Sequence, residues 1–134
     1  MKKIFIFFVI ACIFTACGDD CYNAPQPVVF KFVNTDDENL ITNGTLNSYL
    51  VKDENQVAVQ LTKTSDDMLI LENVGAYNGT IHYTFTSNIK AFDFSIQSSE
   101  FKGGCDGYQI NKLTFTGVGF DVTDEDGYYK IILE

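Results

Sequence analysis

Few residues of this chain have the type and spacing that chemistry needs, and the first is the single histidine. His82 lies on the polar side of a segment whose hydrophobic residues alternate, 81–87. A catalytic triad needs a serine and a carboxylate beside such a histidine, although its members are not adjacent in sequence. The chain contains no Gly-x-Ser-x-Gly turn to present a serine nucleophile. The sequence therefore predicts no catalytic residue and a non-enzymatic protein, and a small hydrolase is the weakest alternative.

Two acidic segments, 34–39 and 121–127, carry the oxygen ligands that calcium prefers. The second segment fails the EF-hand pattern at its first and last positions, where the strongest ligands belong. The alternative is a solvated hairpin in which Asp126-Gly127 forms a type I′ turn. We therefore expect no cofactor, and loop calcium has only weak candidate ligands: Asp121, Asp124 and Asp126.

The N-terminus has the pattern of a secretory signal. Lys2 and Lys3 precede an unbroken apolar run from Ile4 to Phe14. A helix that crosses a bilayer needs about 20 residues, so this run is too short to span one. A basic start, a short apolar run and small residues after it are typical of a cleaved signal peptide. The alternative is a buried N-terminal strand, but two lysines before a continuous apolar run fit a half-exposed sheet poorly.

The residues that follow the apolar run resemble the signal of bacterial lipoproteins, which ends in a cysteine. Phe14-Thr15-Ala16-Cys17 matches that motif best at its last two positions. The resemblance implies cleavage before Cys17 and a diacylglycerol thioether on its sulfur. Each buried CH₂ of the acyl chains contributes about 0.8 kcal/mol to membrane binding. Cys12 also ends a matching string, but it leaves a shorter apolar run and an apolar tail after cleavage.

This resemblance gives the chain a simple organisation and a location. It implies a lipid-anchored protein of the outer membrane, either at the cell surface or facing the periplasm. Gly18-Asp19-Asp20 loosely matches the acidic cue for surface display in such lipoproteins. The expected parts are a signal peptide over 1–16, a lipidated spacer over 17–27 and a β-sandwich domain over 28–134.

With Cys12 removed and Cys17 acylated, Cys21 and Cys105 remain. An even pair of cysteines in an exported chain indicates a disulfide. Closing a loop of roughly 85 residues stabilises a fold by roughly 4–5 kcal/mol on the chain-entropy model. A redox pair is more typically Cys-x-x-Cys, and a zinc site needs histidines or more cysteines than remain.

The charge of the chain excludes some partners. Cleavage leaves seven lysines against 18 acidic residues, a net charge of −11, and the chain has no arginine. Nucleic acids are bound through neutralisation of phosphates by lysine and arginine, so we expect no nucleic-acid partner. The expected partners are the membrane, through the lipid anchor, and a protein or a glycan.

Hydrophobic residues alternate along most of the chain after 27, which predicts half-buried antiparallel strands. Short strands with frequent turn signals predict an all-β fold, an antiparallel two-layer sandwich of about eight strands, immunoglobulin-like or transthyretin-like. A small barrel is the alternative. The expected strands are 28–34, 48–52, 57–63, 68–73, 81–87, 92–98, 109–116 and 128–133.

Tyrosines near predicted strand ends are the candidate contacts for a partner. Tyr22, Tyr49, Tyr77 and Tyr108 stand at positions where a sugar ring or a protein surface could stack. Tyrosines at such positions also commonly pack the ends of strands, so the signal is weak, and the sequence assigns no ligand-binding residue.

Three stretches resemble a group of small β-sandwich lipoproteins of the Bacteroidota type. They are Cys21-x-x-x-Pro25, FKFVNTDDENLITNGT and the late GGCDGYQI. The resemblance implies no known activity and no site. The sequence therefore predicts a membrane-anchored, non-enzymatic binding or interaction module. The alternative is a structural accessory subunit of an outer-membrane complex.

Overall fold

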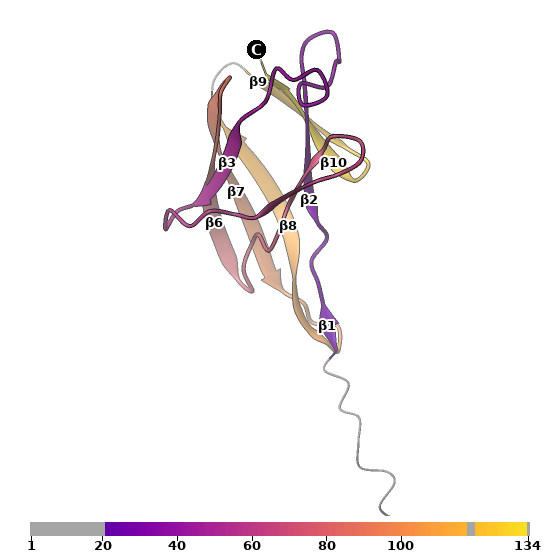
Figure 1. Cartoon of the computed structure of the whole chain (residues 1–134). Coiled ribbons are helices and arrows are strands. Elements are labelled where there is room, and N and C mark those ends of the chain that lie inside the picture. Colours follow the sequence, from indigo (N-terminus) through magenta and orange to yellow (C-terminus); the bar gives the residue numbers. More distant parts are fainter. Residues whose placement is uncertain (1–20, 118–119, 134) are drawn as a thin grey trace, which may run out of the picture.

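The chain folds as a sandwich of two five-stranded sheets (Figure 1). The computed structural model describes residues 21–117 and 120–133. The first sheet has the order β1-β8-β7-β6-β3 and the second has the order β4-β5-β2-β10-β9. In chain order the strands are β1 (Tyr22–Asn23), β2 (Val28–Val33), β3 (Tyr49–Asp53), β4 (Leu61–Lys63), β5 (Leu69–Leu71), β6 (Gly79–Ser87), β7 (Ala91–Glu100), β8 (Asp106–Thr116), β9 (Phe120–Glu125) and β10 (Tyr128–Leu133).

The predicted all-β sandwich is therefore confirmed, and the barrel alternative is wrong because the strands form two separate sheets. Most neighbours pair antiparallel, as in the β6–β7 and β7–β8 hairpins. Two pairs are parallel: β10 lies beside β2, and the short β1 lies beside β8. The described residues include no helix that is long and apolar enough to cross a bilayer.

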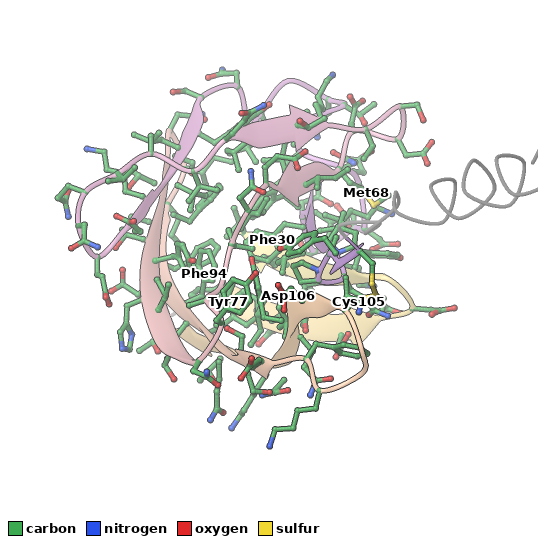
Figure 2. The ribbon with its side chains drawn as sticks, turned by 90° about the horizontal axis from the view of Figure 1, so that it is seen from below. Phe30, Met68, Tyr77, Phe94, Cys105 and Asp106 are labelled. Atoms are coloured by element: carbon green, nitrogen blue, oxygen red, sulfur yellow. A yellow bond between two sulfur atoms is a disulfide. The ribbon has the colours of Figure 1, made fainter. Side chains whose placement is uncertain are left out.

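Alternation along the strands builds the core between the sheets. On β6, Tyr83 and Phe85 point inward and are buried, whereas their neighbours Thr84 and Thr86 are exposed. Removing such a side chain from water contributes about 1.5–3 kcal/mol. Figure 2 shows the sandwich from one end with Phe30 of β2 and Phe94 of β7 facing each other, their ring centroids 5.3 Å apart. Aromatic rings from both sheets therefore fill the centre.

Two predicted segments differ from the structure. The expected strand 57–63 forms only at its end, as β4, and Val57 is 60% exposed. Residues 57–60 instead cross from the first sheet to the second. Ala58 makes a single bridge to Lys52 of β3, in the first sheet, and the chain then enters the second sheet as β4, which pairs with β5. The opposite difference is β9, which occupies residues expected to be a loop.

Candidate functional site

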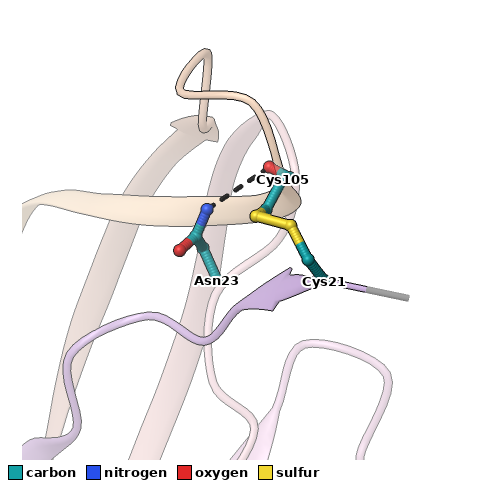
Figure 3. Close-up of a disulfide and its surroundings, with 3 residues drawn as sticks. All are labelled: Cys21, Asn23 and Cys105. Carbon is teal, nitrogen blue, oxygen red and sulfur yellow. Dashed lines mark hydrogen bonds between the residues drawn. A yellow bond between two sulfur atoms is a disulfide. The ribbon is translucent and has the colours of Figure 1, made fainter. Parts of the chain in front are cut away.

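The disulfide predicted between Cys21 and Cys105 is present, with 5.2 Å between the two Cα atoms. It joins the start of β1 to the start of β8, and the Asn23 amide donates a hydrogen bond to the Cys105 carbonyl at 3.4 Å (Figure 3). Gly107 allows this approach: its φ is +151°, and a Cβ there would overlap the Asn23 carbonyl oxygen. The end of the sandwich that holds this disulfide is called the cystine end below.

The prolines after β1 end its pairing with β8. β1 pairs with β8 only at Asp106 and Gly107. Pro25 and Pro27 have no N–H to continue the ladder, so the chain leaves β8 and crosses to the second sheet as β2. Beyond Gly107, β8 therefore has no strand partner on its outer edge within the described residues.

This crossing leaves a hollow where the two sheets part. It lies between β8 on one side and the β9–β10 hairpin on the other, and the crossing segment forms part of its wall. Its volume is about 550 Å³, within the usual range of about 300–1,000 Å³ for ligand pockets. We call it the seam groove, and its main lining residues are Gln26, Phe101, Tyr108, Leu113, Asp124 and Tyr129.

The groove combines aromatic, amide and carboxylate groups. The Tyr129 ring packs on Phe115 with centroids 5.6 Å apart. Burial, and secondarily the nearby Asp124 carboxylate, raise the pKa of the Tyr129 hydroxyl above its ordinary value. A phenol is protonated at neutral pH in any case, so this hydroxyl can donate a hydrogen bond. Asp124 itself is exposed and makes no ion pair with the described residues. The groove therefore presents a phenol, an amide and an unpaired carboxylate beside apolar surface.

The seam continues past this groove as a smaller hollow of about 340 Å³. Leu113, Asp124 and Tyr129 line both hollows, so the two lie side by side. The second hollow adds Lys112 and Val122 to the lining. A ligand longer than one ring would therefore meet side chains of both sheets along the seam.

Residues 74–78, of which the sequence singles out only Tyr77, are hydrogen-bonded to two tyrosines of the first sheet. The Tyr108 hydroxyl donates to the Val74 carbonyl at 2.7 Å, and the Gly75 N–H donates to the Tyr83 hydroxyl at 2.8 Å. Gly75 has a φ of +89°, and a Cβ there would come within 3.0 Å of the Tyr108 ring. Within VGAYNG, Gly75 is the sequence signal for this contact, since the partners Tyr83 and Tyr108 are not adjacent in sequence.

His82 lies on the outer face of the first sheet, directly opposite Ser95 on β7. Its backbone N–H donates to the Glu54 carboxylate at 3.4 Å, which is a long hydrogen bond. The described residues include no hydrogen bond between the His82 imidazole and Ser95, and His82 lines neither hollow of the seam. A serine and a carboxylate are thus near His82, but without the geometry or enclosure of a triad.

The three candidate calcium ligands are not brought together. Asp121 and Asp124 are three residues apart on β9, so their side chains point to opposite faces of the sheet. No group of His, Cys, Asp or Glu side chains in residues 21–117 and 120–133 is placed to hold a metal ion. Asp126 lies in the β9–β10 turn, which is not type I′ because only Gly127 has a positive φ, of 89°.

The four tyrosines singled out from the sequence have different environments. Tyr108 is buried and Tyr49 is half-buried against the core. Tyr22 and Tyr77 are exposed, and the Tyr77 ring leans on Tyr108 with centroids 5.5 Å apart. The structure therefore leaves two of the four available to a partner, both at the cystine end.

Cys17, the predicted lipidation site, lies outside the described residues. Comparison of the chain with family models, curated proteins and solved structures found no match. The candidate site is therefore defined by this chain's own geometry, as the seam groove beside the cystine end.

Proposed function

We propose that this chain is a membrane-anchored lipoprotein that acts as a non-enzymatic binding module, with the seam groove as its binding site. The observation that carries the proposal is the groove itself: about 550 Å³ of space lined by side chains of both sheets. Its aromatic, amide and carboxylate groups suit a neutral ligand with many hydroxyl or amide groups, such as a glycan or a peptide.

The anchor is the second part of the proposal. The lipoprotein-like residues ending in Cys17 support attachment to the outer membrane, at the cell surface or facing the periplasm. The disulfide supports an exported protein, since disulfides persist in oxidising compartments. Mass spectrometry of the membrane-extracted chain tests the anchor directly. An unmodified Cys17 would contradict it.

Binding is tested with the variant Gln26→Ala/Asp124→Ala, which removes two exposed polar groups from the groove. The matched control is Gln97→Ala/Asp121→Ala, which removes an exposed amide and an exposed carboxylate from the outer faces of the two sheets. Wild-type protein is applied to a glycan array and used to capture proteins from solubilised membranes.

We expect the groove variant to lose at least about tenfold in affinity for whatever the wild type retains, because two hydrogen-bonding groups are lost. The control variant should bind like the wild type. Equal binding by both variants would remove the groove from the proposal, and no retained glycan or protein would contradict the binding role.

One observation favours a second candidate, a structural accessory subunit of a larger membrane complex. The outer edge of β8 is free of strand partners over Tyr108–Thr116 within the described residues. An unpaired edge is a template for a strand of a neighbouring protein. Lys112 and the β-bulge opposite Gln97/Ser98 limit unspecific pairing there.

Native electrophoresis of gently solubilised membranes tests the accessory role. An accessory subunit migrates with its complex, and it is released when the edge is blocked by a strand fused to the chain. Migration of the chain alone would contradict this candidate and leave the binding module unaffected.

A further inference from the structure

The exposed aromatic side chains of this protein are concentrated at the cystine end. Five large hydrophobic side chains are exposed among the described residues, and three of them lie here: Tyr22 at 56%, Tyr77 at 48% and Phe101 at 36%. The other two, Leu50 and Val57, lie on β3 and in the turn that follows it. We call the first three the cystine-end aromatics.

The backbone fixes these three rings around the disulfide. Tyr22 lies on β1 opposite Asp106, next to the cystine. Tyr77 rests on Tyr108 at 5.5 Å. Phe101 begins the β7–β8 loop, where its N–H donates to the Gly107 carbonyl at 2.9 Å. Figure 2 looks onto this end, with Tyr77, Cys105 and Asp106 near one another.

The length of chain before Cys21 determines what can cover this surface. Only three residues, Gly18 to Asp20, separate Cys21 from Cys17, the lipid-bearing residue of the proposed function on which this inference rests. An extended chain spans at most about 3.6 Å per residue, so the four steps from Cys17 to Cys21 reach about 14 Å. Because the disulfide ties Cys21 to β8, the whole domain is held at that distance by its cystine end.

We propose that the cystine end is the membrane-facing surface, and that its three aromatics lie in the headgroup layer of the bilayer. Tyrosine and phenylalanine suit this layer because each ring is apolar and the phenol oxygen remains hydrated. The hydrocarbon core of a bilayer is about 30 Å thick, and the headgroup layers on its two sides bring the total to about 40–45 Å. Rings held to the bilayer by a short tether therefore reach the headgroup layer.

The charges at the cystine end indicate that the aromatic rings, rather than ion pairs, make the contact with the bilayer. Lys102 follows Phe101 and places one positive charge beside the lipid phosphates. Glu100 and Asp106 lie at the same end, and the chain that remains after cleavage before Cys17 has a net charge of −11. Attraction to an anionic surface is therefore weak, and the contact should persist in concentrated salt.

The sequence offers a clean reporter, because the chain has no tryptophan. Tyr77→Trp places a single indole at the cystine end. Leu50→Trp is the matched control: Leu50 is 41% exposed and pairs with Thr86, at the far end of β6 from Gly79. Gly79, which follows Tyr77 closely, and Thr86 are about 24 Å apart along β6, at about 3.4 Å per residue.

Full-length lipidated protein is reconstituted into phosphatidylcholine vesicles with brominated acyl chains, and flotation confirms attachment. We expect the Tyr77→Trp emission to shift to shorter wavelength and to fall by about twofold or more, because the indole lies within reach of the bromines. Leu50→Trp should keep its emission. Both results should be unchanged in concentrated salt.

The failures of the two proposals are distinguishable. If the chain does not float with vesicles, the anchor is wrong and this inference falls with it. If the chain floats and the Tyr77→Trp emission is unchanged, the inference is overturned while the anchor stands. Quenching of both tryptophans alike would also overturn it, since the domain would then have no fixed orientation.

Discussion

At the end of the sandwich opposite the cystine, phenylalanines from both sheets pack ring to ring in an unbroken row, two pairs stacked and one tilted. Ring centroids are 4.8 Å apart for Phe32–Phe85, 4.9 Å for Phe85–Phe92 and 4.8 Å for Phe92–Phe120. We call this row the phenylalanine end. At the cystine end the sheets part, a hollow opens and rings point to solvent.

The two ends are therefore held by different forces. Burial of apolar surface, which is roughly proportional to area, holds the phenylalanine end. A covalent bond and a few specific hydrogen bonds hold the cystine end, where the buried Ser98 hydroxyl accepts from the Ala76 N–H at 2.9 Å. Directional bonds hold the strands in place without filling the space between them, which leaves surface for a partner.

The largest loss of stability should come from Cys21→Ser/Cys105→Ser, which removes the covalent bond of the cystine end. The bond closes a loop with a sequence separation of 84, so its loss should lower the free energy of unfolding by about 4–5 kcal/mol on the chain-entropy model. Urea unfolding measures the change. Reduction of the wild type should give the same loss. A decrease in the free energy of unfolding of less than about 1 kcal/mol would mean that the other contacts of the cystine end are sufficient without the disulfide.

Phe85→Ala and Phe101→Ala make the same substitution at the two ends. Phe85 is fully buried in the row, so its removal should cost about 3–4 kcal/mol, including the cavity left behind. Phe101 is 36% exposed, and its removal should cost less than about 1 kcal/mol. Thermal and urea unfolding measure both. Equal costs would contradict the division between a packed end and an open one.

The sequence predicted the packed part of this contrast far better than the open part. Alternation is local, so segments such as 81–87 and 92–98 were correctly predicted as strands, and their inward residues form the core. The disulfide is predicted from the two cysteines that remain once the lipoprotein-like signal accounts for Cys12 and Cys17. The prediction was wrong for 57–60 because a crossing between sheets can carry the same alternation as a strand.

The groove could not be predicted because it depends on distant partners. Pro25 and Pro27 lie within the predicted spacer 17–27, but their effect is on β8, about 80 residues later, whose edge they leave open. β9 was missed because its acidic residues resemble a loop, although Phe120 and Val122 alternate toward the core. Neither feature is visible without knowing which strands meet.

Tyr108→Phe tests the directional bonds of the cystine end. It removes the hydroxyl that donates to the Val74 carbonyl and leaves that buried acceptor unpaired. The expected cost is about 1–2 kcal/mol in urea unfolding. Tyr129→Phe is the control, because no hydrogen bond of the Tyr129 hydroxyl is present among the described residues. A cost for Tyr129→Phe as large as that for Tyr108→Phe would indicate loss of packing rather than of a hydrogen bond.

The smallest expected effect is a loss of stability in alkali. Burial raises the pKa values of the Tyr83 and Tyr108 hydroxyls, so these phenols ionise more readily in the unfolded chain than in the folded one. Their contribution is complete below the unfolded pKa of about 10, and it is lost as pH rises through the folded pKa values. Urea midpoints followed from neutral pH upward should therefore decline above about pH 10.

The variant Tyr83→Phe/Tyr108→Phe separates this effect from the hydrogen bonds. It should be less stable than the wild type at neutral pH, where both hydroxyls are bonded, yet lose less stability in alkali. The Tyr129 hydroxyl retains its raised pKa there, so a shallower decline should remain. A decline as steep as in the wild type would place the titrating groups elsewhere.

The phenylalanine end has no ionisable side chain in its row, so an alkaline transition should begin at the cystine end, with faster amide exchange at residues 74–78.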